Sequence, residues 1–333
     1  MRKPFLASSL ILSLIFSSCI GFRIAMHSLG DTFSSGPEKV LHKVKEPIKD
    51  NVRLSVLWIG HSSMLVQVYD RVLLFDPMFN KRLAGLLMRK REPGLDFNSV
   101  SRLDMVLVSH SHMDHMSFSS LKMIAGRFPG CTLVFPEGDE DYLPNFDMNL
   151  LRVKTGKYWD NQYLGPTVLA DSIRITPVYA YHTGGRYVID TYIWKTKGAT
   201  GYIVQYKDVC IYFAGDTGYN EYAFKNIGKA FKIDLAFIPI GPCRNCDSTG
   251  MKYHASSLEA LEIFSDLNAE YMIPIHYGTL TYFRDADYPG QILRQILQDP
   301  ESGFYPVRDR IKILGIGEQI IWPVDNEPTG KDH

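Results

Sequence analysis

Three histidines and one aspartate fall within six consecutive positions of the chain, in Ser109-His110-Ser111-His112-Met113-Asp114-His115. Neutral imidazole and carboxylate are the ligands that zinc, manganese and iron take in proteins. The cluster follows the apolar run from Met105 to Val108, which is typical of a buried strand. Residues two apart at a strand end point to the same side, so His110 and His112 are expected to share one ion, while Asp114 and His115 face a second. A histidine-rich surface turn is the alternative.

Three further residues of metal-binding type stand shortly after other apolar runs. They are His182, Asp216 and His276. Glycines follow His182 and flank Asp216, and glycine lets a backbone approach a site closely. Each of the three alone is equally compatible with a turn or a core position, but together with the cluster they make a candidate set of seven ligands.

Short apolar runs that predict strands recur from about Val52 onwards, and helical patterns are fewer. The expected strands are Leu54 to Ile59, Met64 to Tyr69, Val72 to Phe75, Met105 to Val108, Thr132 to Phe135, Ile173 to Val178, Thr191 to Trp194, Gly201 to Tyr206, Val209 to Ala214, Leu235 to Ile240, Tyr271 to Ile275 and Gln319 to Trp322. The expected helices are Phe118 to Ala125, Leu258 to Leu267, with a capping box from Ser256 and Glu259, and Gln291 to Gln298. Two series of strands, each followed by helices, predict an α/β fold with two sheets packed face to face and helices outside.

The composition is that of a globular protein with a sizeable core, since 45% of the 333 residues are hydrophobic. Lys and Arg together number 36, as do Asp and Glu, so the formal net charge is +0. No overall field attracts nucleic acid, and no nucleic-acid partner is expected.

The N-terminal segment has the order of a lipoprotein signal peptide. Arg2 and Lys3 precede an apolar run from Phe5 to Phe16, and small residues lead to Cys19. Residues 1–18 are therefore predicted to be removed, and a lipidated Cys19 to hold the protein on the extracytoplasmic side, at the periplasmic face or the cell surface. An uncleaved anchor and ordinary secretion are the alternatives.

After this leader, residues 19–51 are expected to form a tether, residues 52–325 the folded domain and residues 326–333 a tail. Cys243 and Cys246 lie within the domain, where they form either a small disulfide or two free thiols; no catalytic role is expected of them.

The blocks around the candidate ligands resemble the metallo-β-lactamase superfamily, from about Val52 to Trp322. The resemblance implies an αββα sandwich (metallo-β-lactamase fold), two mixed β-sheets packed face to face with helices outside, and a site for two divalent ions, zinc first, with manganese or iron as alternatives. It implies that His110, His112 and His182 bind the first ion, that Asp114, His115 and His276 bind the second, and that Asp216 bridges them. Asp76, in Leu74-Phe75-Asp76-Pro77, matches the first motif of the superfamily and is expected to order the neighbouring loop.

Several blocks narrow the resemblance to the N-acyl-phosphatidylethanolamine-hydrolysing phospholipase D group, and more distantly to ascorbate-6-phosphate lactonase-like proteins. They are Trp58-Ile-Gly-His-Ser62, Asp76-Pro77, His182 with Arg186, Ile193-Trp194, Phe213-Ala-Gly-Asp-Thr-Gly-Tyr219, Pro239-Ile-Gly241, Met251-Lys-Tyr-His254 and Ile275-His-Tyr-Gly-Thr279. The chain departs from the phospholipase group at Ser256-Ser257-Leu258 and at Tyr277.

The resemblance therefore implies a binuclear metal-dependent hydrolase, a phosphodiesterase of phospholipase D type. Two divalent ions lower the pKa of a shared water from about 15.7 towards neutrality, and the resulting metal-bound hydroxide would attack phosphorus. Asp114 and Asp216 would fix the ions. His254 would bind phosphate or protonate the leaving oxygen, unless it merely caps the following helix or packs near it. Arg186 would pair either with phosphate or in a structural salt bridge.

The same chemistry fits a carbonyl, so a lactonase or another ester hydrolase acting on a small molecule is the second hypothesis. A non-catalytic, lipid-anchored binding protein is the third. The phospholipid hypothesis also depends on Cys19 and on residues 81–91, where leucines and a methionine are bracketed by basic side chains, as suits contact with an anionic bilayer. A segment packed on the body of the protein is the alternative there.

Overall fold

The computed structural model describes residues 36–323, except 42, 84–86, 156–161, 188–189, 191–197, 242–251 and 281–284. The expected signal peptide, Cys19, Cys243, Cys246 and the expected strand Thr191 to Trp194 lie outside the described residues. Within the described ranges, no helix is both long and apolar enough to cross a membrane.

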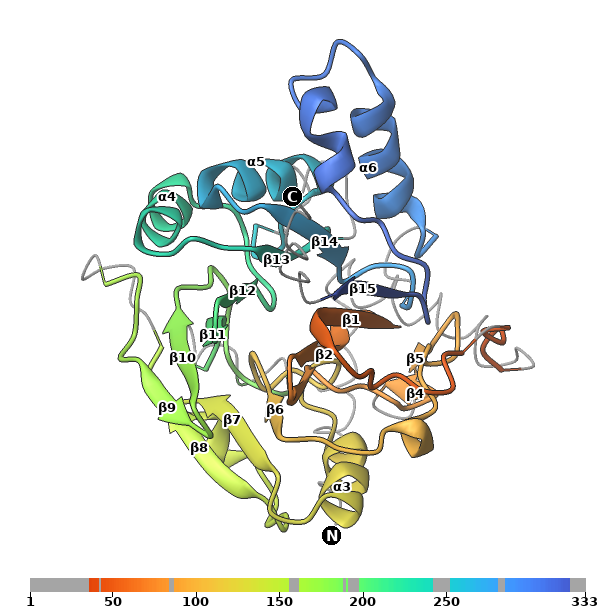
Figure 1. The fold of residues 1–333 in the computed structure, drawn as a ribbon, viewed down its shortest axis with the longest axis vertical. Coiled ribbons are helices and arrows are strands. Elements are labelled where there is room, and N and C mark those ends of the chain that lie inside the picture. Colours follow the sequence, from red (N-terminus) through yellow and green to blue (C-terminus); the bar gives the residue numbers. More distant parts are fainter. Residues whose placement is uncertain are drawn as a thin grey trace, which may run out of the picture.

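Two large sheets form the body of the molecule (Figure 1). The first has the strand order β15 (Gln319–Pro323), β1 (Val52–Gly60), β2 (Ser63–Val68), β3 (Arg71–Phe75), β6 (Met105–Leu107), β7 (Thr132–Pro136) and β8 (Asn149–Val153). The second has the order β14 (Tyr271–Ile275), β13 (Leu235–Pro239), β12 (Val209–Phe213), β11 (Gly201–Tyr206), β10 (Ile173–Val178) and β9 (Val168–Ala170). A separate hairpin pairs β4 (Arg82–Leu83) with β5 (Leu87–Met88).

Both sheets follow the same plan. Each begins as an antiparallel meander, β1 to β3 in the first sheet and β9 to β12 in the second. Each continues with parallel strands, β3, β6, β7 and β8 in the first and β12, β13 and β14 in the second. Parallel neighbours end at the same edge of a sheet, so the residues that follow β3 and β6 are brought together, as are those that follow β12 and β14.

In the part of the chain that the structure describes, four α-helices cover the outer faces (Figure 1). They are α3 (Phe118–Arg127), α4 (Glu221–Ala230), α5 (Ser257–Leu267) and α6 (Tyr288–Gln298). The apolar face of α3 packs with the first sheet, and α5 packs against β13 between α4 and α6. Three short 3-10 turns complete the described helical segments: η1 (Phe97–Ser99), η2 (Asp139–Asp141) and η5 (Tyr305–Arg310).

The alternation of the strands sorts their apolar side chains between two cores. Val56 and Phe75 face the second sheet, where Phe75 lies 4.7 Å from Phe213 between ring centroids. Their neighbours Leu57 and Leu74 face α3 instead. Burying one such side chain contributes about 1.5–3 kcal/mol, so a run of buried residues with period two fixes which face of the strand meets which layer. The predicted sandwich is confirmed.

Each strand predicted within the described residues is found, and the helices lie where they were expected. The capping box is confirmed, since the Ser256 hydroxyl accepts from Glu259 N and the Glu259 carboxylate accepts from Ser256 N. The sequence did not predict α4, the edge strands β8 and β9, or the short hairpin of β4 and β5. In α4 only Ala223, Phe224 and Ile227 are buried, and they span little more than one turn of the helix. The strands β8 and β9 are edge strands that are largely exposed, so their apolar patterns are weak.

Part of the expected tether packs on the domain. The side chain of Gln67 accepts a hydrogen bond from Lys49 N at 2.8 Å and donates one to Lys49 O at 2.7 Å. Val44 and Ile48 are partly buried against the layer between α3 and the first sheet. Residues 36–51 therefore add a flank to the domain wherever the structure describes them.

Candidate metal centre

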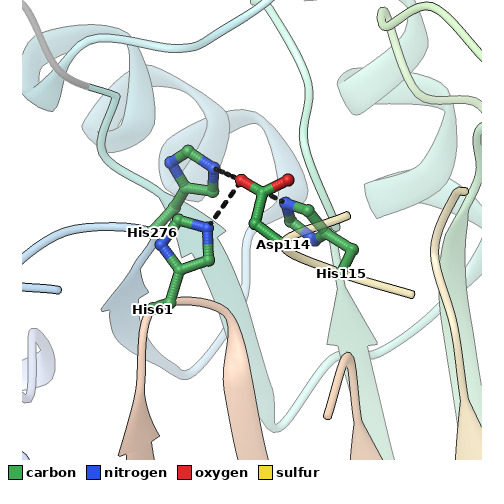
Figure 2. Close-up of side chains that lie close together, drawn as sticks. All are labelled: His61, Asp114, His115 and His276. Atoms are coloured by element: carbon green, nitrogen blue, oxygen red, sulfur yellow. Dashed lines mark hydrogen bonds and ion pairs between the residues drawn. The ribbon is translucent and has the colours of Figure 1, made fainter. Parts of the chain in front are cut away.

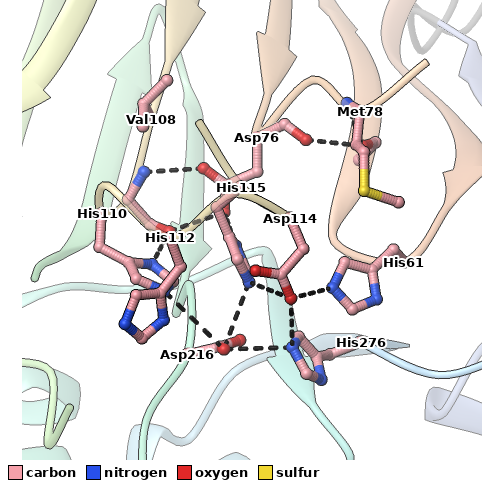
Figure 3. A network of polar contacts seen from close by, with 12 residues as sticks. His61, Asp76, Met78, Val108, His110, His112, Asp114, His115, Asp216 and His276 are labelled. Carbon is pink, nitrogen blue, oxygen red and sulfur yellow. Dashed lines mark hydrogen bonds and ion pairs between the residues drawn. The ribbon is translucent and has the colours of Figure 1, made fainter. Parts of the chain in front are cut away.

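The predicted metal ligands meet at one edge of the two sheets, and Figure 3 labels all of them except His182. His110 to His115 follow β6, His182 follows β10, Asp216 follows β12 and His276 follows β14. The loop of Asp216 passes very close to the loop of His110, because a Cβ on Gly215 would lie 2.5 Å from Ser109 Cβ. Gly215 also has a φ of +60°, so both the close approach and the backbone conformation favour glycine here.

The first group of ligands consists of three imidazoles. His110 Nε2 lies 2.9 Å from His112 Nδ1, which in turn lies 3.2 Å from His182 Nε2. Nitrogens that bind one zinc ion at 2.0–2.1 Å in a tetrahedral arrangement lie about 3.3 Å apart. The three nitrogens thus already have nearly the separation that a shared ion requires, and they belong to the residues that the superfamily resemblance assigns to the first ion.

The second group contains Asp114, His115 and His276, together with a residue that was not predicted, His61 (Figure 2). Asp114 Oδ2 lies 3.8 Å from His115 Nε2 and 4.0 Å from His276 Nε2. His61 Nε2 lies 3.0 Å from the same oxygen. These four residues form one compact set of potential ligand atoms.

Asp216 lies between the two groups. Its Oδ2 atom is 3.2 Å from His115 Nε2 and 3.1 Å from His276 Nε2 in the second group. The same oxygen is 4.0 Å from His110 Nε2 and 3.9 Å from His182 Nε2 in the first. Asp216 Oδ1 is buried and has no hydrogen-bond partner among the described residues. A carboxylate in this place suits the bridging role that the superfamily resemblance implies.

Asp76 orients two of the imidazoles. Its Oδ2 atom accepts a hydrogen bond from His115 Nδ1 at 2.6 Å and another from the Ser109 hydroxyl at 2.7 Å. Ser109 Oγ is itself 2.9 Å from His110 Nδ1, so it can accept from that ring. Both rings thereby turn their Nε2 atoms towards the site, which is how outer partners prepare histidine ligands. Asp76 also accepts from Ser109 N and so orders the loop after β6.

Arg186 braces the same loop from the other side. Its Nη1 donates to the carbonyls of Ser111 and Met116, both at 2.9 Å, and its guanidinium lies 3.6 Å from the Phe118 ring centroid. Of the two roles considered for Arg186, the structure shows contacts within the protein. They are to backbone carbonyls and an aromatic ring, in place of the expected salt bridge.

Burial prepares the imidazoles of the first group for metal. It holds the pKa of His110 well below the usual value, with help from the neighbouring imidazoles, and it does the same for His182. Burial also lowers the pKa of His112. The three rings are therefore neutral at pH 7, and neutral imidazole is the form that binds metal.

The second group carries charge. Burial alone would lower the pKa of His115, but the surrounding carboxylates, Asp216 first, raise it well above the usual value. Burial would likewise raise the pKa of Asp216, yet His115 and His276 hold it well below its usual range. A protonated imidazole and a carboxylate thus face each other here, and a divalent cation can replace that proton.

The residues present therefore fit two divalent ions. Imidazole and carboxylate donors lie within bonding reach of two common centres, and their outer nitrogens are hydrogen-bonded in several cases. The described residues do not select between zinc, manganese and iron, all of which take these donors.

His254 lies at the rim of this site. Its Nδ1 atom is 3.6 Å from Asp216 Oδ2, and its side chain is 20% exposed, compared with 2% for His182 and 2% for His276. Burial lowers the pKa of His254 to about 4. It is thus a neutral imidazole beside the ligands that keeps contact with solvent.

His61 is the site residue that sequence reasoning missed. It stands in the turn between β1 and β2, far in sequence from the other ligands, and a lone histidine after a strand has no spacing signal of its own. The only available signal was its place in Trp58-Ile-Gly-His61-Ser62, one of the blocks that carry the resemblance to the phospholipase group.

A two-sheet sandwich with histidines and carboxylates gathered at one edge defines the class of metal-dependent hydrolases of the metallo-β-lactamase fold. The model of the beta-lactamase superfamily domain matches residues 71–277, and the chain belongs to that superfamily.

Relatives and solved structures agree with this assignment. An N-acyl-phosphatidylethanolamine-hydrolysing phospholipase D of Caenorhabditis elegans is 29% identical over 68% of this chain and 64% of its own length. A mitochondrial protein of the same description from Saccharomyces cerevisiae is 28% identical over 67% of this chain and 47% of its own length. The chain thus covers less than two thirds of each. The structure of a metallo hydrolase from Ignicoccus hospitalis shares the fold, with a TM-score of 0.57 and 18% identity over 82% of this chain and 99% of that one.

Proposed function

We propose that this metal-dependent hydrolase is a phosphodiesterase of phospholipase D type that acts on N-acyl-phosphatidylethanolamine-like phospholipids. The observation that carries the proposal is the position of His254. It is a partly exposed imidazole beside Asp216, at the point where a substrate phosphate would meet the metal ligands. The similarity to two relatives described as phospholipases of this kind supports the same substrate class.

Two divalent ions bound at this site would neutralise phosphate charge and activate water for attack on phosphorus. The residues of the chain supply the rest. Asp76 and Arg186 hold the ligand loop rigid, and Asp216 keeps the two ligand groups together. His254 is neutral at pH 7 because its pKa is lowered to about 4, so its ring N–H donates a hydrogen bond to a phosphate oxygen.

Variants of His254 test this proposal. The full chain, purified in detergent and loaded with zinc, is assayed with N-acyl-phosphatidylethanolamine, a simple phosphodiester and a lactone. The expected products from the phospholipid are phosphatidic acid and N-acylethanolamine. His254→Ala is expected to keep both metal equivalents and lose on the order of 10²-fold in kcat, while His254→Gln, which keeps an N–H donor, recovers part of the rate. Turnover of the lactone alone would contradict the proposal and favour an ester hydrolase.

We further propose that a lipidated Cys19 holds the protein at a membrane on the extracytoplasmic side. The order of residues 1–19 supports this. Incorporation of a fatty-acid analogue that disappears in Cys19→Ala is the expected result, and labelling that persists in the variant would refute it.

Most of the described basic side chains in residues 81–91 make contacts within the protein, so few of them support the proposed contact with a bilayer. Arg89 is buried and donates to the carbonyls of Met78 and Arg91, at 2.5 and 3.0 Å. Lys90 and Arg91 both pair with Asp287. Leu87 and Met88 are half-buried. Among the described residues of this segment, Lys81 is the exposed cation, and weaker liposome binding of Leu87→Ser would support the contact.

A further inference from the structure

We infer that His61 is a positioning residue for the second metal ion, and that it acts by fixing the carboxylate of Asp114. The inference rests on the two-ion site of the proposed function and adds to it a residue outside the seven expected ligands. Four observations carry it: the backbone conformation of His61, its backbone hydrogen bonds, the direction of its ring and the exposure of Asp114.

The backbone of His61 is held in an uncommon conformation. Its φ is +56°, in the left-handed region, which costs a non-glycine residue about 1 kcal/mol or more. The surrounding structure imposes it. His61 N donates to Thr279 Oγ1 at 2.7 Å, and His61 O accepts from Trp58 Nε1 at 2.9 Å and from His276 N at 3.0 Å. One of these partners, His276, is itself an expected ligand of the second ion.

This backbone aims the ring at the second ligand group (Figure 2). The side chain of His61 is 1% exposed, and its ring centroid lies 4.2 Å from that of His276. Its Nε2 atom lies 3.0 Å from Asp114 Oδ2, the oxygen that also faces the Nε2 atoms of His115 and His276. His61 therefore contacts the oxygen of Asp114 that is directed into the site.

Asp114 needs such support more than the other ligands do. Its side chain is 15% exposed, whereas those of His115 and His276 are 0% and 2% exposed, so water can compete for its carboxylate. An N–H donor on a rigid, buried ring restricts the carboxylate to one orientation. The effect belongs to the second ion, because the described contacts of the His61 ring are with Asp114, His115 and His276, which all lie in the second group.

A direct ligand role for His61 is the competing explanation. The second group already offers four donors, from Asp114, His115, His276 and the bridging Asp216, which is the usual number for zinc. The nearest acceptor of His61 Nε2 is the carboxylate, and a nitrogen that donates a proton to Asp114 has no lone pair left for an ion. The geometry thus assigns His61 to the outer contacts.

Two substitutions separate the side-chain donor from the backbone effect. Asn tolerates a positive φ well, so His61→Asn keeps the turn, but its short amide does not reach Asp114. Gln carries an amide N–H near the position of the imidazole Nε2, so His61→Gln retains a donor. Zinc binding to the full chain in detergent is measured by competition with a chelator. For His61→Asn we expect the second equivalent to bind 10–100-fold more weakly and the first to be unchanged, with most of the loss recovered in His61→Gln.

Each other outcome has a distinct meaning. A wild-type protein that binds only one equivalent would contradict the two-ion site itself. Two equivalents in the wild type with unchanged affinity in His61→Asn would overturn the inference about His61. A loss in His61→Gln as large as that in His61→Asn would show that the donor is not what matters, and would overturn the positioning role.

A measurement on the wild-type protein tests the inference even if the variants do not fold. Nitrogen-15 NMR of the wild-type imidazoles reports whether His61 Nε2 carries a proton before and after zinc is added. The positioning role predicts that this proton stays when both equivalents are bound. Loss of the proton on binding the second equivalent would show that His61 is a ligand.

Discussion

Asp139 is a buried carboxyl group close to the metal-binding loop. It begins η2, shortly after β7, and its Oδ2 atom has no hydrogen-bond partner among the described residues. Burial raises the pKa of Asp139 well above its usual value, with Glu140 and Asp76 adding to the shift, while Ser111 and Arg186 oppose it.

The sign of this shift leads to a stability prediction. The native state holds the proton of Asp139 more tightly than the unfolded chain does, so the free energy of unfolding falls as pH rises from about 4 towards the raised pKa. Asp139→Asn, which has the same shape and no charge, is expected to remove this dependence and to raise the melting temperature at pH 7. A melting temperature at pH 7 that drops in Asp139→Asn, with an unchanged pH profile, would show that the carboxyl group is stabilised as an anion.

At the scale of elements, hydrogen bonds between two hairpin turns join the two sheets. Tyr69, at the β2–β3 turn, donates to Asp208 at the β11–β12 turn, at 2.6 Å. Tyr206 donates in return to Asp70 at 2.9 Å. Arg53 on β1 adds contacts to Asp208 at 2.7 Å and to Asp234 at 3.1 Å. The turns are the corresponding parts of two sheets built on the same plan.

Replacing Arg53 tests whether these contacts between the sheets contribute to stability alone and not to metal binding. Its side chain is 24% exposed and that of Asp234 is 15% exposed, so Arg53→Met is expected to lower the free energy of unfolding by about 1 kcal/mol. Zinc stoichiometry should remain that of the wild type, because none of these residues contacts a ligand. The check is denaturant unfolding together with metal analysis, and loss of zinc from a folded Arg53→Met protein would contradict this division of roles.

The predictable parts of the fold are those with strong local patterns. The central strands are buried apolar runs, and the helix after Ser256 carries its own capping box, so both could be located in the sequence. The edge strands β8 and β9 bury too few side chains to show such a pattern, and the three buried residues of α4 span little more than one turn. The spacing of the residues from His110 to His115 alone predicts a metal-binding cluster. His61 joins it only through pairing of distant segments, which no local pattern encodes.

At the scale of the whole molecule, the site joins the two sheets. The cluster after β6 comes from the first sheet, whereas His182, Asp216 and His276 come from the second. The two halves would thus be held at one place by ligands that can share an ion, and they are held at another by the hydrogen bonds of Tyr69 and Tyr206. A site assembled from both halves depends on the complete sandwich, which is why its residues spread across most of the folded domain.

The most direct test of the central claim follows the oxygen atom of water. The zinc-loaded full chain is given N-acyl-phosphatidylethanolamine in water labelled with heavy oxygen, and the products are weighed by mass spectrometry. Attack of water on phosphorus with departure of the alcohol predicts one labelled oxygen in phosphatidic acid and none in N-acylethanolamine, and Asp216→Ala should give neither product. Label in a released fatty acid, or a two-zinc protein that leaves the phosphodiester intact, would contradict the claim.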